Sequence, residues 1–236
     1  MKKSLIRLLL TVAAISALGA CRDESKLPAP KLAGNVPLVI PQISSDTAKN
    51  YLNFNRTRAS VNTLAGYASP GNSRPVFEFT FNIDNSRDKK VKTVEVYKTF
   101  KRIGSTAALT TLGPRVGVGA YSTFPATVSV SSQDLLTGLQ RLVVPTDGTA
   151  SYLLNLKAAT NTSSNSVQRD DIILFTFEYI LEDGSRVILT PITDTKVASG
   201  PGQPLANATS TVPVLATTTQ INKPYAVEAV IRDPIK

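Results

Sequence analysis

The chain contains no histidine and no tryptophan, and it has a single cysteine, Cys21, among 236 residues. Without histidine it lacks the commonest general base and the commonest zinc ligand, which excludes Ser-His-Asp and Cys-His nucleophilic catalysis. One cysteine cannot form an intramolecular disulfide, so a folded domain must be held together by burial of apolar side chains. We therefore expect a protein that is not an enzyme and that uses no cofactor and no metal.

Carboxylates offer the one remaining route to catalysis or to metal binding. Glycoside hydrolysis needs two carboxyl groups on opposite sides of the scissile bond. The acidic pairs Asp170-Asp171 and Glu182-Asp183 lie at expected strand ends and turns, where acids ordinarily cap or face solvent. Asp84, Asn85 and Asp88 offer oxygen atoms that suit calcium. Contacts to their own turn backbone explain them more simply, so we predict no site at any of these positions.

The first 20 residues have the pattern of a signal peptide. Lys2, Lys3 and Arg7 form a basic start, and residues 8–20 carry no charge. That run is shorter than the roughly 20 residues of a membrane-spanning helix. It ends in Leu18-Gly19-Ala20-Cys21, which resembles a bacterial lipobox, in which the thiol receives a diacylglycerol and the cysteine becomes the new N-terminus. The alternative is an ordinary secretory signal followed by an incidental thiol.

The charge of the chain does not predict a nucleic-acid partner. There are 26 Lys+Arg and 17 Asp+Glu; three of the basic residues and no acidic residue precede Cys21, which leaves 23 against 17, or +6. The remaining basic residues are scattered, as in the stretch from Lys89 to Arg102 (which includes Lys98), and they form no concentrated stripe. The charge serves either ordinary solubility or attraction to acidic surface polysaccharide.

Alternation with a period of two predicts strands that have one buried side and one solvent-facing side. In residues 77–84 (FEFTFNID), Phe and Ile alternate with polar residues, and residues 91–100 (VKTVEVYKTF) return after a turn. Such alternation is typical of antiparallel sheets. Residues 171–181 (DIILFTFEYIL) form the most apolar expected strand, and Asp183-Gly184 predicts a type I′ hairpin after it.

Shorter elements complete the expected fold. Strands are predicted at residues 126–131 and 151–158, and Ser132 is expected to cap a helical turn. Many short strands, turn signals and one short helical turn predict an all-β fold, an antiparallel β-sandwich. The expected organisation is, in order, a lipoprotein signal peptide (1–20), a lipidated N-terminus and proline-containing spacer (21–37), and a β-sandwich domain (38–236) with its core in 74–192, a loose loop-like stretch in 192–223 and a final strand in 224–231.

Five segments together resemble a known family. They are FEFTFNIDN, VKTVEVYKTF, VSVSSQDLLTGL, RDDIILFTFEYILEDGSRVILT and KPYAVEAVI. In this order they resemble small surface lipoproteins of Bacteroidota, which are encoded beside SusD-like proteins and TonB-dependent receptors and are built on an immunoglobulin-like sandwich. Residues 22–25 (RDES) also resemble the export tag of such lipoproteins. The resemblance implies a lipid-anchored protein at the surface of the outer membrane, but it carries over no binding residue.

Two functions from different classes remain open. The first is an accessory or ligand-binding role in surface nutrient uptake, with a polysaccharide or a SusD-like/TonB-dependent receptor complex as partner. Sugars stack on flat aromatic faces, and Tyr97 and Tyr121 are the candidate ligand-binding residues. The second is a structural or adhesive role at the cell surface without a small-molecule ligand.

Overall fold

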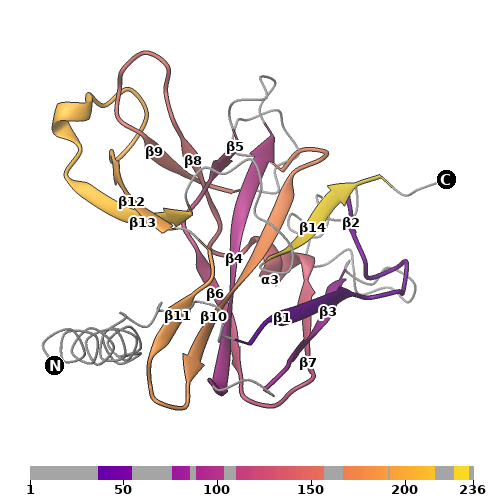
Figure 1. Cartoon of the computed structure of the whole chain (residues 1–236). Helices are drawn as coiled ribbons and strands as arrows, with labels where there is room; N and C mark the ends of the chain where they lie inside the picture. The colour runs from indigo at the N-terminus through magenta and orange to yellow at the C-terminus, as the bar shows by residue number, and fades with distance from the viewer. Residues whose placement is uncertain are drawn as a thin grey trace, which may run out of the picture. The chain divides into compact units, whose positions relative to one another are not determined.

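The computed structural model describes residues 37–54, 76–85, 89–103, 110–156, 167–190, 192–215 and 226–233 (Figure 1). Cys21, the predicted signal peptide, nearly all of the spacer and Asp88 lie outside these residues. None of the helices in the described ranges is both long and apolar enough to cross a membrane.

The first sheet of the sandwich is three-stranded and antiparallel. Its order is β1-β3-β7, formed by β1 (Val39–Ile43), β3 (Val76–Ile83) and β7 (Ala126–Ser131). β3 has the predicted alternation, because Phe77, Phe79, Phe81 and Ile83 are buried. Within the part of the chain that the structure describes, β7 pairs only with β3, so its other edge is open.

The second sheet is larger and has β10 and β4 at its centre. Its order is β2-β14-β10-β4-β5, with β11 also paired to β10 and β6 also paired to β4. All of these pairs are antiparallel except β2 with β14. The strands are β2 (Leu52–Asn53), β4 (Val91–Ile103), β5 (Thr110–Leu112), β6 (Val116–Tyr121), β10 (Ile172–Leu181), β11 (Arg186–Ile188) and β14 (Ala226–Arg232).

Together the two sheets have the strand order of an immunoglobulin-like sandwich. β1-β3-β7 corresponds to strands A, B and E, and β14-β10-β4-β6 corresponds to G, F, C and C′. The prediction of an antiparallel, all-β sandwich is therefore confirmed. No described strand occupies the position of strand D beside β7, and this leaves one side of the sandwich open between β6 and β7.

Aromatic rings from the two sheets meet in the core, as the alternation predicts. Phe77 on β3 stacks on Phe175 of β10, with ring centroids 5.7 Å apart and planes at 10°. The ring centroids of Phe81 on β3 and Phe177 on β10 are 5.5 Å apart. Offset and tilted ring pairs add to the stabilisation from apolar burial, so this cluster takes the place of the missing disulfide.

The hairpin after β10 differs from the predicted type I′ turn. Type I′ needs positive φ at both central residues, but here only Gly184 (φ 79°) has it. The Gly184 N–H donates to the Leu181 carbonyl at 3.0 Å, and the Leu181 N–H donates to the Ser185 carbonyl at 2.9 Å. The connection is thus a three-residue loop with glycine in the left-handed position, the next commonest hairpin solution.

The prediction of a loose, loop-like stretch at residues 192–223 is wrong over 192–215, and residues 216–223 lie outside the described ranges. β12 (Ile192–Val197) and β13 (Ser210–Leu215) form an antiparallel ribbon, with a short 3-10 turn, η3 (Leu205–Asn207), between them. Threonine is a β-branched residue that suits strands, so a Thr-rich composition did not exclude them. The ribbon packs apolar side chains on the outer face of the larger sheet, where Leu215 joins Leu174.

A second ribbon lies against the first. It consists of β8 (Gln140–Val143) and β9 (Tyr152–Asn155), which pair antiparallel. β9 lies within the predicted strand at residues 151–158. Leu142 of β8 is buried with Val197 and Val214 of the β12–β13 ribbon. The two ribbons therefore pack on part of the outer face of the larger sheet.

Candidate functional site

The open side of the sandwich contains a cleft between β6 and β7, and we take it as the candidate functional site. Its volume is about 380 Å³, within the usual range for small-molecule sites. Apolar side chains of both strands form its walls, and polar groups of β4, β6 and the turn after β7 converge on it. The principal lining residues are Lys98, Val116, Val118, Tyr121, Val130 and Asp134.

Lys98 projects from β4 toward the interior of the sandwich. It lies on the same side of the strand as Val94, Val96 and Phe100, and only 5% of its surface is exposed. Its Nζ donates to the main-chain carbonyl of Asp134. Burial lowers the pKa of the Lys98 amine to about 8, against an opposing effect of the Asp134 charge. The cleft therefore contains an ammonium group that is poorly solvated.

Tyr121 forms one wall of the cleft. It is opposite Val94 in the β4–β6 register and so shares the interior face of the sheet. Its ring packs edge-on against Phe81, with centroids 5.6 Å apart and planes at 88°. Burial raises the pKa of the Tyr121 hydroxyl. Because Phe81 holds the ring, Tyr121 presents a fixed aromatic surface and a hydroxyl to the cleft.

Asp134 lies on the short helix α3 (Ser132–Leu136), directly after β7. The Asp134 N–H donates to Ser131 Oγ at 3.2 Å, and Ser131 Oγ donates to Asp134 Oδ2 at 2.7 Å. The predicted helical turn is confirmed, but the hydroxyl that accepts the hydrogen bond from the Asp134 N–H belongs to Ser131 and not to Ser132. This exchange of hydrogen bonds holds an exposed carboxylate beside the cleft.

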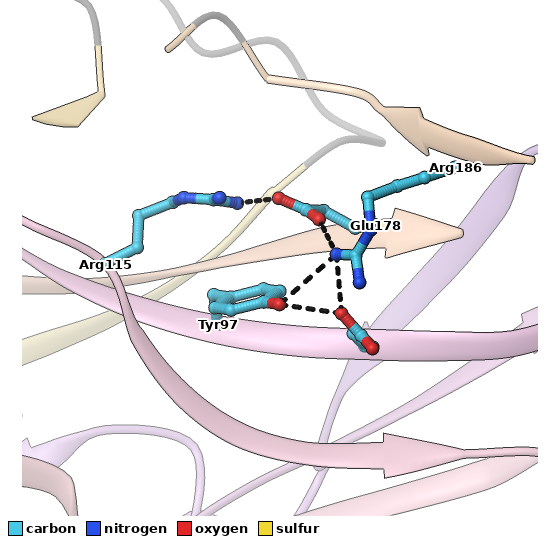
Figure 2. Close-up of polar contacts among 5 residues, drawn as sticks. Tyr97, Arg115, Glu178 and Arg186 are labelled. Atoms are coloured by element: carbon cyan, nitrogen blue, oxygen red, sulfur yellow. Dashed lines mark hydrogen bonds and ion pairs between the residues drawn. The ribbon is translucent and has the colours of Figure 1, made fainter. Parts of the chain in front are cut away.

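Tyr97, the other predicted ligand-binding residue, belongs to a charged network on the opposite face of the sheet (Figure 2). Its hydroxyl donates to Glu95 Oε2 at 2.7 Å and accepts from Arg186 at 3.4 Å. The Arg115 guanidinium lies over the ring, 4.5 Å from its centroid. Glu178, whose side chain is 1% exposed, forms ion pairs with both Arg115 and Arg186.

The network is a structural feature that joins β11 to the centre of the sheet. Hydrogen bonds from Tyr97 and Arg186 lower the pKa of Glu95, while burial and the Glu95 contact raise the pKa of the Tyr97 hydroxyl. Two carboxylates and two guanidinium groups balance in charge. Because Arg115 covers a face of the Tyr97 ring, a sugar cannot stack there without displacing it.

The structure thus separates the two predicted tyrosines and pairs Tyr121 with residues that the sequence did not indicate. Tyr97 and Tyr121 project from opposite faces of the larger sheet, and only Tyr121 lines the cleft. Lys98 was one basic residue among several in the sequence analysis. The signal that distinguishes it is its position two residues after Val96 and two before Phe100, on the apolar side of its strand.

The acidic clusters considered in the sequence have structural partners. Asp171 forms a buried ion pair with Arg102. The Asp183 carboxylate accepts hydrogen bonds from the Lys89 amine and from the Ser185 N–H, and these contacts lower the pKa of Asp183. Asn85 Oδ1 accepts the Val91 N–H at 3.0 Å. Across the described ranges, no group of three His, Cys, Asp or Glu side chains is placed to hold a metal.

No protein-family model, curated protein or solved structure matches this chain. The function is therefore argued from the cleft and its residues.

Proposed function

We propose that this chain is a non-enzymatic lipoprotein, anchored at the outer face of the outer membrane, whose sandwich captures a saccharide during nutrient uptake. Its partners in this proposal are a SusD-like protein and a TonB-dependent receptor, which take the saccharide onward. The observation that carries the proposal is the cleft between β6 and β7. It combines an aromatic ring held by Phe81 with a buried amine and a carboxylate.

The lining of the cleft suits a sugar in both of its chemical aspects. A pyranose presents apolar C–H faces, which pack well on an aromatic ring and on valine side chains such as Val118 and Val130. It also presents hydroxyl groups, which need donors and acceptors when they leave water. The Lys98 amine and the Asp134 carboxylate supply these around the same cavity.

We expect Tyr121→Ala to weaken retention of a bound oligosaccharide by about tenfold or more. A ring of this size contributes roughly 1.5–3 kcal/mol when its apolar surface is buried, and 1.4 kcal/mol corresponds to tenfold in affinity. The measurement is affinity electrophoresis against a polysaccharide panel, followed by calorimetry on the retained glycan. Tyr121→Phe should keep most of the affinity, because it keeps the ring.

Tyr152→Ala is the matched control, since Tyr152 is half-buried on β9 and does not line the cleft. It should leave retention unchanged. Failure of every polysaccharide to be retained by the wild-type chain would contradict saccharide capture and would favour the structural or adhesive role.

The proposed anchor depends on Cys21 alone, because it is the one thiol of the chain. We expect the wild-type protein to incorporate labelled palmitate and Cys21→Ser to incorporate none. Two or more acyl chains give stable attachment, at about 0.8 kcal/mol per buried methylene, so Cys21→Ser should also leave the membrane fraction. Ser25→Ala, four residues further on, is the control and should keep the label. Equal label in the wild type and Cys21→Ser would rule out the anchor.

A further inference from the structure

Lys98 differs from the other lysines of the described ranges in its burial. Lys101, three positions further along β4, pairs with Glu228 at 3.1 Å, and Lys49 and Lys89 also have carboxylate partners. Lys98 is the one buried lysine of the described chain, and its amine makes a single hydrogen bond there, to a main-chain carbonyl. An ammonium group has three N–H donors, so two of them have no acceptor among the described residues.

A buried ammonium that forms no ion pair is costly to keep, even though the Asp134 charge acts on it from nearby. Removing a charge from water is unfavourable unless an opposite charge or several hydrogen bonds compensate, which is why buried lysines are rare. A methionine at this position would fill the same space on an apolar side of the strand without that cost. Perturbed ionisable groups in clefts are candidates for function on this ground.

We propose that the cleft binds a saccharide that carries a carboxylate, a uronic acid residue, and that this carboxylate pairs with the Lys98 ammonium. The inference rests on the proposed saccharide capture and specifies the class of sugar. A carboxylate accepts up to four hydrogen bonds and places a negative charge directly against the amine, so it satisfies the two remaining donors of Lys98.

The rest of the cleft orients such a ligand. The titratable groups that line it are Lys98, Asp134 and Tyr121. The Asp134 carboxylate repels the acid group of the sugar and accepts bonds from its hydroxyls, while Tyr121 offers an aromatic face.

The pairing makes the affinity dependent on pH in a defined direction. Burial lowers the pKa of Lys98 to about 8, so the amine of the free protein loses its proton as the pH rises through that value. The carboxylate of a uronic acid is already ionised there. Only the ammonium form pairs with it, so the affinity should fall by roughly tenfold between pH 7.5 and pH 9.

The test is calorimetric titration of the full chain in detergent with trigalacturonate, with its fully methyl-esterified form and with neutral galactotriose. Trigalacturonate should bind at least about tenfold more tightly than the ester, since a hydrogen bond to a charged group is worth that much or more. Lys98→Met should abolish this preference. Lys101→Met, on the same strand but outside the cleft, should retain it.

Each other outcome contradicts a defined part of the argument. Equal binding of trigalacturonate and its ester, or a preference that survives Lys98→Met, would overturn the inference and leave saccharide capture standing. Absence of binding to all three, together with the polysaccharide panel, would overturn both. The esterified ligand makes the test independent of how well Lys98→Met folds, because it removes the charge from the other partner.

Discussion

Replacing Phe79 by alanine is expected to lower the free energy of unfolding by about 3–5 kcal/mol, the usual cost of removing a phenyl group from a packed core. Phe79 has no exposed surface. The centroid of its ring lies 5.0 Å from the ring centroid of Phe175 and 6.2 Å from that of Phe177, both in the facing sheet. It also lies 6.0 Å from Phe77 and 6.5 Å from Phe81 on its own strand.

The position makes the loss difficult to repair by local adjustment. Phe79 is in the central strand of the three-stranded sheet, opposite Ile43 on one side and Val128 on the other. Four rings would line the resulting cavity, and they are themselves held in strands, so the site collapses only in part. The chain has no disulfide to offset the loss, because it has a single cysteine.

Urea-induced unfolding followed by circular dichroism measures this effect. Thr127→Ala is the control, because Thr127 is exposed on the neighbouring strand β7 and its loss should change stability by no more than about 0.5 kcal/mol. A loss below about 1.5 kcal/mol for Phe79→Ala would mean that the two sheets do not pack through this aromatic cluster.

The second large effect is expected at the buried ion pair between Arg102 and Asp171. Arg102 donates from Nε to Oδ1 at 2.8 Å and from Nη2 to Oδ2 at 2.7 Å, so both carboxylate oxygens are bound. The Gln168 N–H also donates to Oδ2, at 2.6 Å. The Asp171 side chain is 2% exposed. The pair joins the end of β4 to the start of β10, the two central strands of the larger sheet.

We expect Asp171→Ala to destabilise the protein by about 3–5 kcal/mol, because it removes the carboxylate that binds the buried Arg102 guanidinium through Nε and Nη2. The double variant Arg102→Met, Asp171→Leu should be less destabilised than Asp171→Ala, since apolar side chains of similar volume often replace a buried pair at little cost. Both are measured by denaturant unfolding. A double variant less stable than the single one would contradict loss of the carboxylate beside a buried charge as the cause.

A matched pair on the surface provides the control. Arg169 and Asp233 also join the region before β10 to the end of β14, at 2.7 Å, but both side chains are about half exposed. Asp233→Ala should therefore cost no more than about 1 kcal/mol. If Asp171→Ala and Asp233→Ala had the same small effect, burial would not govern the strength of these pairs.

The faces of individual strands could be predicted from the sequence, because a period of two is a local property of an extended chain. Phe77, Phe79 and Phe81 are buried, as their alternation with polar neighbours indicated, and Phe175 and Phe177 share one buried face of β10. The opposite face of β10 is buried as well, at Leu174, Thr176 and Glu178. The all-β class and the helical turn after residue 131 follow from patterns of the same short range.

Predictions based on composition or on one dipeptide were less reliable. The Thr-rich stretch from 192 contains the β12–β13 ribbon, because strands accept threonine and the larger sheet offers it an apolar face. Asp183-Gly184 forms a hairpin, but with a three-residue loop, because only Gly184 and not Asp183 takes positive φ.

By itself, the sequence determined which side of most strands is apolar, that the chain is all-β and that it has a single thiol. The tertiary structure alone decided which strands are neighbours, and through this which side chains meet. It placed Lys98 against Asp134, 36 positions later, and it separated Tyr97 from Tyr121 by putting them on opposite faces of one sheet. The physical reason is that alternation depends on adjacent residues, whereas pairing and register depend on the burial gained by the whole sandwich.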